Sequence, residues 1–590
     1  MAALLQGSIF RWGAIALLAT SVLAAPRRAL AADGLGIALG LFCGWLFLSA
    51  VFLTPSYSAE ALYRPLVLFG GYAAGVSLGR PALTQLFRAG TALLALLVLL
   101  GLLQLYFGFW HLAHNPQRAA ATFITPNTFA TAINLILLPL AVLALVRGRS
   151  RWAYALALWL FAGLLATESR GGWLAAFAGL VFIAWYQGVP RTREAREPWM
   201  RLMAGLLWVY IAFWVLLRLL PLIPIPGLAL GTGLAESFGE TVVSRGTSYR
   251  IDIAMVALGR IAERPLAGAG ASMFSNLMEM TKPAELDIGQ TFRFVHNDYL
   301  QIWVEFGLIG LVLLGAVIGS AFVSLLRSRR VDRADSLPIA CGAALTSALA
   351  HAAVDFPLYI PFLLLLVGLW LGALSAHGSH PGRLEPLLAT IGRRLAPLRT
   401  RLVGGALAVA ALAWLAQPAA ADFATSEALT ELRAGRPDSG LYWQSVARRL
   451  EPRNGVHYWT EAVIWRDQAV EARSKAFAAR ADMLFAEGMR ADPYQVANYI
   501  ERARMHRTHA ELFDQPAGPR QLLAWTGEAL RLRPFSLVAQ AEHARTLAYA
   551  GQTEEALRIV RAMLERHGDT GMARGLAKEF GLREPVETTR

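Results

Sequence analysis

The feature that most constrains this chain is a series of apolar stretches, each about long enough to cross a lipid bilayer. A helix needs roughly 20 apolar residues to span about 30 Å of hydrocarbon. Candidate spans run near 9–25, 31–53, 62–79, 89–109, 127–146, 152–168, 171–187, 200–220, 302–326, 336–354, 357–376 and 401–416. Only 16% of the 590 residues are charged, whereas soluble proteins carry about 25%. We therefore expect an all-α, polytopic membrane helix bundle of about twelve spans.

The positive charge is concentrated in short connections between these spans. The formal net charge is +14, yet residues 417–590 hold 24 basic and 23 acidic side chains, so the excess lies in residues 1–416. The basic connections contain Arg27 and Arg28; Arg80 and Arg88; Arg147, Arg149 and Arg151; Arg191, Arg193 and Arg196; Arg327, Arg329, Arg330 and Arg333; and Arg393, Arg394, Arg399 and Arg401. Basic loops stay in the cytoplasm, which explains the charge without nucleic-acid binding.

The remaining connections are then expected to face the periplasm of a bacterial inner membrane. They lie around 54–61, 110–126, 168–170, 221–301 and 355. If all twelve spans are real, both termini lie outside the cytoplasm, and the N-terminal apolar run is a retained span.

The cysteines and a histidine pair give no sign of a metal or disulfide site. Cys43 and Cys341 both lie inside apolar stretches. His111 and His114 are three residues apart, but no carboxylate or cysteine cluster joins them. We expect no metal and no cofactor.

Two stretches are too long to be simple connections. One is a loop at 221–301, inside a membrane domain at 1–416. The other is a charged tail at 417–590, in which Pro452, Pro493 and Pro534 are spaced 41 residues apart, each at a helix boundary. The small and apolar positions that follow the last proline resemble a tetratricopeptide helix pair: Ala541, Ala544, Leu547, Ala548, Gly551, Ala556 and Leu557. The tail is therefore expected to be a periplasmic stack of helix pairs that docks envelope proteins.

A polar turn at 167–173 interrupts two apolar spans. Ser169 and the glycines at 171 and 172 suit a tight turn, and Arg170 lies at the hydrocarbon boundary. A guanidinium there can grip phosphate oxygens with two parallel hydrogen bonds. The alternative is an ion pair of Arg170 with Glu168 and a side chain that reaches to the interface.

Two further polar segments lie in and after the long loop. Arg250 precedes a helix-like run at 251–261, where it and backbone amides can address a phosphate; the alternative is a solvated basic loop. His296 stands just before the span 302–326, and an imidazole at the mouth of a membrane cavity can take a proton from a hydroxyl group. Asn297, Asp298 or a backbone carbonyl would orient its ring for this role. The alternative is an interfacial histidine that caps a helix.

Other polar positions carry less information. Asn127 opens a span and can simply cap it, and His351 and Asp355 lie at another helix break, where they either support a site or pack within the bundle. Intramembrane and membrane-edge ionisable groups usually have a function or a partner.

Six motifs in one order carry a family resemblance. They are TFITPNTFA at 122–130, SRGGW at 169–173, Arg250 with Pro265 and GAG at 268–270, HNDYLQ at 296–301, VEFGLIG at 304–310 and VDFPL at 354–358. Together they resemble the O-antigen ligase and Wzy-type polymerase superfamily, which includes bacterial protein O-oligosaccharyltransferases. The resemblance covers roughly residues 90–376.

The resemblance implies a GT-C-like membrane glycosyltransferase whose donor is a glycan on undecaprenyl pyrophosphate. Arg170 and Arg250 would bind the pyrophosphate, and His296 would activate the acceptor hydroxyl. Asn127, Asn297 and Asp355 would support the site. The guanidinium groups can stabilise the leaving pyrophosphate without a metal ion.

The acceptor stays open at this point. It can be another lipid-linked repeat unit, lipid A-core or a protein hydroxyl, and we rank glycan polymerisation or ligation above protein glycosylation. The long tail is unusual for lipid A-core ligases. Two other classes are a polysaccharide transporter and a non-catalytic envelope docking protein. A transporter should show broken helices at the membrane midplane and repeats among its spans, whereas the polar groups here gather at one membrane face.

Overall fold

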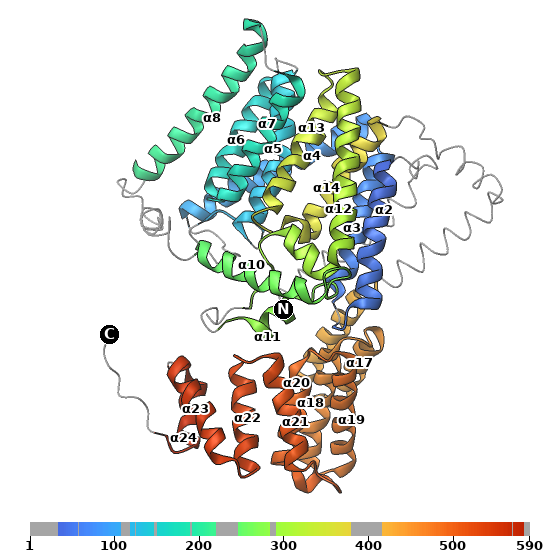
Figure 1. The fold of residues 1–590 in the computed structure, drawn as a ribbon, viewed down its shortest axis with the longest axis vertical. Helices are drawn as coiled ribbons and strands as arrows, with labels where there is room; N and C mark the ends of the chain where they lie inside the picture. The colour runs from blue at the N-terminus through green and yellow to red at the C-terminus, as the bar shows by residue number, and fades with distance from the viewer. Residues whose placement is uncertain are drawn as a thin grey trace, which may run out of the picture.

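The computed structural model describes residues 34–56, 58–107, 118–123, 125–146, 150–188, 192–219, 246–283, 291–378, 416–568 and 570–582, and all regular structure there is helical (Figure 1). The bundle helices are α2 (Gly34–Leu48) with the π-helical turn η1 (Ser49–Leu53), α3 (Ala59–Ser77), α4 (Arg80–Phe107), α5 (Pro126–Val146), α6 (Arg151–Ala166), α7 (Arg170–Gln187), α8 (Arg193–Leu219), α12 (Asp298–Val331), α13 (Ser336–Ala352) and α14 (Pro361–Gly378). They coincide with the predicted spans from 31–53 through 357–376, which confirms the helical membrane bundle. The predicted span 9–25, nearly all of 401–416, and His111 and His114 lie outside the described residues.

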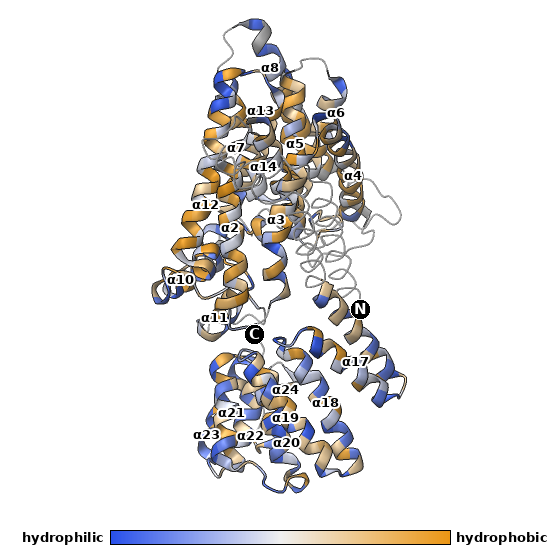
Figure 2. Ribbon diagram, turned by 90° about the vertical axis from the view of Figure 1, so that its right-hand side faces the viewer, coloured by the Kyte–Doolittle hydropathy of each residue, from blue (hydrophilic) through white to orange (hydrophobic). Residues whose placement is uncertain are grey.

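Hydrophobic residues predominate along the helices of this bundle (Figure 2), and many large ones are exposed, as a lipid environment requires. Large exposed examples are Phe52, Leu96, Phe177, Trp208 and Val312. Five described helices are by themselves long and apolar enough to cross a membrane: Gly34–Leu53, Arg80–Leu105, Pro126–Leu145, Arg196–Leu216 and Asp298–Val331. Shorter apolar helices pack among them.

The predicted loop at 221–301 contains two helices, α10 (Gly246–Glu263) and α11 (Phe274–Thr281). Both lie at the end of the bundle that faces the tail (Figure 1). The opposite end of the bundle carries basic connections: Arg80 and His377 both contact Asp335 there, at 3.3 and 3.0 Å. Among the described connections, those at the start of α4, the start of α13 and the end of α14 thus meet at this end.

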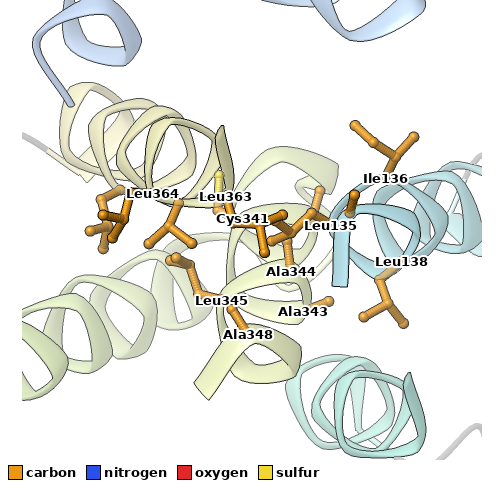
Figure 3. Packing of buried hydrophobic residues seen from close by; sticks show 14 of the residues in the cluster. Leu135, Ile136, Leu138, Cys341, Ala343, Ala344, Leu345, Ala348, Leu363 and Leu364 are labelled. Atoms are coloured by element: carbon orange, nitrogen blue, oxygen red, sulfur yellow. The ribbon is translucent and has the colours of Figure 1, made fainter. Parts of the chain in front are cut away.

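Helix α13 lies at the centre of the bundle because its side chains are small. Its buried positions include Ala343, Ala344 and Ala348, which pack against leucines of α5 and α14 (Figure 3). Small residues allow backbones to approach closely, which is the main source of helix packing in lipid.

Helices α3 and α14 pack through matching glycine pairs. A Cβ atom on Gly71 or Gly75 of α3 would overlap the backbone of α14, and one on Gly368 or Gly372 would overlap the backbone of α3. This reciprocal pattern of small residues four apart holds the two backbones in contact.

Helix α12 is broken at Gly307, where φ is +69°. The segment after α10 fills the break with backbone hydrogen bonds: Leu308 N to Pro265 O is 2.8 Å, and Gly270 N to Glu305 O is 2.9 Å. Two of the six sequence motifs, 265–270 and 304–310, therefore pair with each other, and their glycines serve backbone packing.

We expect Gly307→Ala to destabilise the protein by at least about 2 kcal/mol, because an L-residue is strained at positive φ and the new methyl group would overlap the carbonyl of Leu266. Thermal unfolding in detergent measures the loss. Gly315→Ala in the same helix is the control, since its Cβ would meet open space; equal stability of the two variants would contradict this account.

The tail consists of helix pairs with a period of 41 residues. Its helices are 416–433, α17 (Pro437–Leu450), α18 (Gly455–Ala472), α19 (Lys475–Ala491), α20 (Val496–Thr508), η5 (Ala510–Leu512), α21 (Pro519–Leu532), α22 (Leu537–Tyr549), α23 (Thr553–His567) and α24 (Gly571–Glu579). Helices end at Leu450, Ala491 and Leu532, two residues before each repeated proline. Ala462, Ala503 and Ala544 occupy equivalent positions and are all fully buried.

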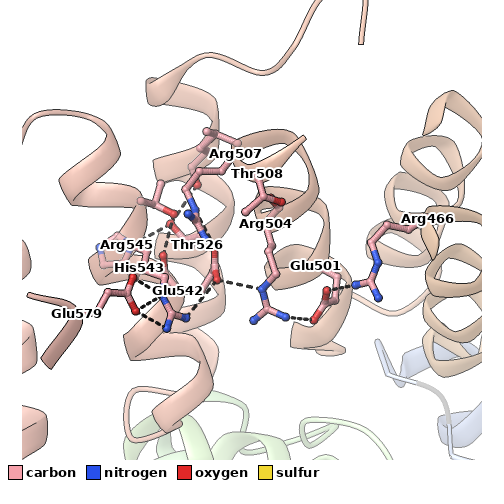
Figure 4. Close-up of polar contacts among 12 residues, drawn as sticks. Arg466, Glu501, Arg504, Arg507, Thr508, Thr526, Glu542, His543, Arg545 and Glu579 are labelled. Carbon is pink, nitrogen blue, oxygen red and sulfur yellow. Dashed lines mark hydrogen bonds and ion pairs between the residues drawn. The ribbon is translucent and has the colours of Figure 1, made fainter. Parts of the chain in front are cut away.

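Charged side chains link neighbouring pairs of the tail into a ladder (Figure 4). Arg466 of α18 contacts Glu501 of α20, and Arg504 of α20 contacts both Glu501 and Glu542. Glu542 is fully buried and pairs with Arg504, Arg507 and Arg545. The basic and acidic side chains of the ladder pair with one another, which explains why the tail has nearly equal numbers of basic and acidic residues.

Arginines beside two of the repeated prolines hold the tail against the bundle. Arg453 donates hydrogen bonds to the carbonyl oxygens of Val51 (2.7 Å) and Thr54 (2.6 Å). Arg533 precedes Pro534 as Asp492 precedes Pro493, and it donates a hydrogen bond to Asn276 Oδ1 at the start of α11 (2.8 Å). The tail is therefore fixed to the same end of the bundle as α10 and α11.

Candidate active site

The turn at 353–355, after α13, is the meeting point of the polar side chains at this end of the bundle. It is contacted, or its neighbour His351 is, by residues near the N-terminal ends of α5, α7, α10 and α12. Asn297, the N-cap of α12, donates from Nδ2 to Ala353 O at 3.0 Å. Thr131 of α5 contacts His351 Nδ1 at 2.7 Å. Helix N-termini carry partial positive charge and favour anions.

His296 and Asp355 form a hydrogen-bonded pair, with Nδ1 and Oδ1 3.2 Å apart. An ionised carboxylate only accepts hydrogen bonds, so Nδ1 carries the proton and Nε2 remains free to accept one. The imidazole is 29% exposed while Asp355 is buried. His296 also has φ of +58° and its ring meets Phe356 edge-on. This local strain at a polar site is typical of a functional position.

Arg250 lies beside this pair. Its Nη1 donates to the carbonyl oxygen of Val354 at 3.1 Å, next to Asp355. The helix that carries it begins at Gly246, earlier than the predicted run at 251–261. Arg250 thus lies in the first turns of a helix and is not part of a free loop.

Arg170 is the first residue of α7, whose N-cap Ser169 accepts a hydrogen bond from Gly172 N at 3.1 Å. The next residue, Gly171, is so close to the 351–355 turn that a Cβ would meet Val354 at 2.8 Å and His351 at 3.0 Å. Burial raises the pKa of the Glu168 carboxyl while Arg118 and Arg170 lower it, so Arg170 lies within electrostatic range of Glu168, as the alternative interpretation of this turn requires.

Arg118 is a third arginine here, and the sequence reasoning missed it. Its Nε donates to Thr167 O at 2.8 Å, and its Nη2 donates to Asn127 Oδ1 at 2.9 Å. Burial lowers the pKa of this guanidinium, nearby Glu168 and Asp355 raise it, and Arg250 and Arg170 lower it. Arg170 and Arg250 therefore both lie within electrostatic range of Arg118.

The two carboxyl groups near these arginines differ in their titration. Burial raises the pKa of Glu168, and the opposing effect of Arg118 and Arg170 does not cancel it. Burial also raises the pKa of Asp355, but the hydrogen bond from His296 and the surrounding positive charge outweigh it, so the net pKa lies below its usual value. Asp355 therefore remains ionised at neutral pH.

A buried network of hydrogen bonds connects the segments that carry the site. Arg64 of α3 donates to Tyr359 O (3.1 Å), and the Tyr359 hydroxyl donates to Glu305 Oε2 (3.0 Å). Gln301 donates to the other oxygen of Glu305 at 2.8 Å and accepts from Val295 N at 2.7 Å. The residue before His296 is thus tied to the same framework as the turn at 357–359.

An apolar cavity of about 900 Å³ opens next to this network. It is lined by α2, α3, α7, α12, α13 and α14, and Tyr299, Leu349 and Leu358 line the end near the site. Tyr299 is two residues from Asn297, and its hydroxyl donates to Leu349 O at 2.9 Å. A cavity of this size and composition suits an apolar chain.

The structure thus brings His296, Arg170, Arg250, Asn297 and Asp355 to one end of the bundle. Asn127 is also close, but its amide oxygen binds Arg118. Arg118 has no distinctive neighbours in the sequence, and only its spacing before the 122–130 motif could have drawn attention to it.

We expect Asp355→Asn to lower the rate of any reaction that uses His296 as a base by on the order of a hundredfold, because the amide no longer fixes the ring or balances its charge.

The depressed pKa of Asp355 also makes the stability of the folded protein depend on pH. Ionised Asp355 stabilises the folded state above the unfolded-state pKa of about 3.9, and this contribution is lost as the pH falls below that pKa. Thermal unfolding of both forms from pH 3 to pH 7 measures this: the wild-type protein should lose more stability on acidification than Asp355→Asn. Identical pH profiles would contradict the assignment.

Comparison with known families agrees with the motifs. Residues 155–315 match the family model described as O-antigen ligase, and this stretch includes Arg170, Arg250 and His296. No curated protein matches the chain. The match covers about a quarter of the chain, and it supports membrane glycan ligation or polymerisation in general for a stretch that is similar to the O-antigen ligase family.

Proposed function

We propose that this protein transfers a glycan from an undecaprenyl-pyrophosphate carrier to an acceptor hydroxyl group, during polymerisation or ligation of a surface polysaccharide. One observation carries the proposal: a partly exposed histidine, bound to Asp355 and with a free nitrogen that can take a proton, shares the 351–355 turn with Arg250 and with the start of the helix that carries Arg170. That arrangement fits a diphosphate that gains negative charge as it leaves, beside a nucleophilic alcohol.

The reaction follows from these positions. The acceptor oxygen attacks the anomeric carbon while His296 Nε2 takes the hydroxyl proton. The bond from that carbon to the phosphate oxygen breaks, and its electron pair leaves with the polyprenyl diphosphate. Arg170 and Arg250 stabilise the charge on this leaving group. Direct displacement inverts the anomeric configuration.

The apolar cavity offers a place for the carrier lipid. It lies beside the site and is bounded by α12 and α13, so an isoprenoid chain in it would place its diphosphate near the 351–355 turn. In this proposal the site end of the bundle faces the periplasm of a bacterial inner membrane, because the basic connections lie at the other end. The tail, a tetratricopeptide-like domain at 417–590 in this proposal, would then be periplasmic and available to envelope proteins.

Deletion of the gene, followed by analysis of envelope glycans and lipid-linked intermediates, tests the function. A polymerase predicts loss of long chains with single units retained, and a ligase predicts accumulation of full-length lipid-linked chains. Loss of sugar from a protein would instead indicate protein O-glycosylation. Unchanged envelope glycans and lipid-linked intermediates would contradict the proposal.

A further inference from the structure

Arg118 is held in place before any substrate arrives. Its backbone is anchored at the end of α6, where Ala119 N donates to Ala166 O at 2.9 Å. Two residues later, Ala121 O accepts a hydrogen bond from Gln104 of α4 at 2.8 Å. The segment that carries Arg118 is thus tied to both neighbouring helices.

The side chain of Arg118 is oriented by neutral partners only. Thr167 O and Asn127 Oδ1 together use two of the five N–H groups of the guanidinium. In the part of the chain that the structure describes, Nη1 has no hydrogen-bond acceptor. The planar group is therefore fixed in direction and still has donors for an anion.

The surrounding charges favour such an anion. Among the described residues, the carboxylates that act on Arg118 are Glu168 and Asp355, while Arg250 and Arg170 add positive charge, and Asp355 is already bound to His296. Positive charge held at a membrane edge without a full set of counter-ions is costly unless a ligand supplies negative charge.

The number of arginines distinguishes two kinds of lipid carrier. A sugar on a polyprenyl monophosphate presents one phosphate group with one negative charge. A sugar on a polyprenyl diphosphate presents two groups with one negative charge each. One or two guanidinium groups can satisfy the first, whereas three match the larger number of oxygens of the second.

We infer that Arg118 is a specificity-determining residue that contacts the diphosphate of the donor and makes the protein prefer polyprenyl diphosphate over polyprenyl monophosphate carriers. This inference rests on the proposed function. Arg170 and Arg250 serve both carriers, while Arg118 adds binding only where a second phosphate is present. Asn127 is a positioning residue that orients Arg118.

The test compares transfer by the purified full chain from the same glycan on a polyprenyl diphosphate and on a polyprenyl monophosphate. For Arg118→Ala we expect kcat/KM with the diphosphate to fall about tenfold to a hundredfold, the loss typical of one hydrogen-bonded charge. The value with the monophosphate should change little, so the preference between the two carriers shrinks by the same factor. Inorganic pyrophosphate should also inhibit the variant more weakly than the wild-type protein.

Two further variants keep the test decisive. Arg118→Lys keeps the charge but not the planar fork, and it should lose part of the preference even if Arg118→Ala does not fold. Arg329→Ala is the matched control, because Arg329 also donates to two backbone carbonyl oxygens, of Tyr186 and Trp185, at the other end of α7. It should keep the wild-type preference.

The outcomes separate this inference from the proposed function. An unchanged preference in Arg118→Lys, or equal losses with both carriers in Arg118→Ala, would overturn the role of Arg118. If Arg170→Ala and Arg250→Ala still abolish transfer in that case, the proposed function stands. If the wild-type protein transfers from neither carrier, the proposed function itself fails.

Discussion

His296→Ala is expected to reduce glycan transfer by roughly a hundredfold to ten-thousandfold, the range measured for loss of a positioned general base. The imidazole is partly exposed, and its Nδ1 proton is bound by Asp355, so only Nε2 can accept a proton from the acceptor. The loss should appear in kcat more than in the KM for the lipid-linked donor, because the diphosphate is bound by other groups. Transfer assays with purified protein measure both constants.

A matched control exists at the other end of the bundle. His377 pairs with Asp335 through Nε2 at 3.0 Å, so His377→Ala also removes a histidine from an ion pair with an aspartate. It should leave transfer nearly unchanged. Equal activity of His296→Ala and His377→Ala would contradict the role of His296.

Arg250→Ala is expected to reduce transfer about a hundredfold to a thousandfold, as removal of one preorganised donor to a developing negative charge does in other enzymes. Arg250 stands beside the His296–Asp355 pair and reaches Val354 O. Arg250→Lys should recover only part of the activity, because the ammonium group lacks the guanidinium fork.

Arg260→Ala serves as the control for Arg250. Arg260 lies on the same helix, near its opposite end, and pairs locally with Glu263 at 2.8 Å. It should behave like the wild-type protein in transfer assays. If Arg250→Lys or Arg250→Ala retained full activity with folded protein, the guanidinium group would have no part in the reaction.

The bundle could be predicted from the sequence because the lipid environment imposes simple rules. Apolar stretches of sufficient length mark the spans, and charge asymmetry marks the two ends. The tail period was visible for a similar reason, since Pro452, Pro493 and Pro534 end helices at equivalent positions.

Long-range contacts were harder to predict. The glycines at 268, 270 and 307 looked like turn or family markers, but they allow a loop to fill a break in α12. The pairing of two distant segments has no local signal. The contact of Arg453 with the end of α2 is another case, because any exposed arginine in a tail looks alike in sequence.

The candidate site contains residues of both kinds, some that could be predicted from the sequence and one that could not. His296, Arg170 and Arg250 stand out because polar residues at a membrane edge are costly and need a reason. Arg118 does not stand out, since a single arginine near the end of a span is ordinary. Its importance comes only from the position of its guanidinium between Asn127 and Thr167.

Glycan transfer can be tested in liposomes with the purified protein, one defined undecaprenyl-diphosphate oligosaccharide and an acceptor glycolipid. The account predicts that the wild-type protein releases one undecaprenyl diphosphate for each glycan found on the acceptor, and that His296→Ala releases almost none. Release of the carrier without glycan on any acceptor, or equal release by both proteins, would contradict it.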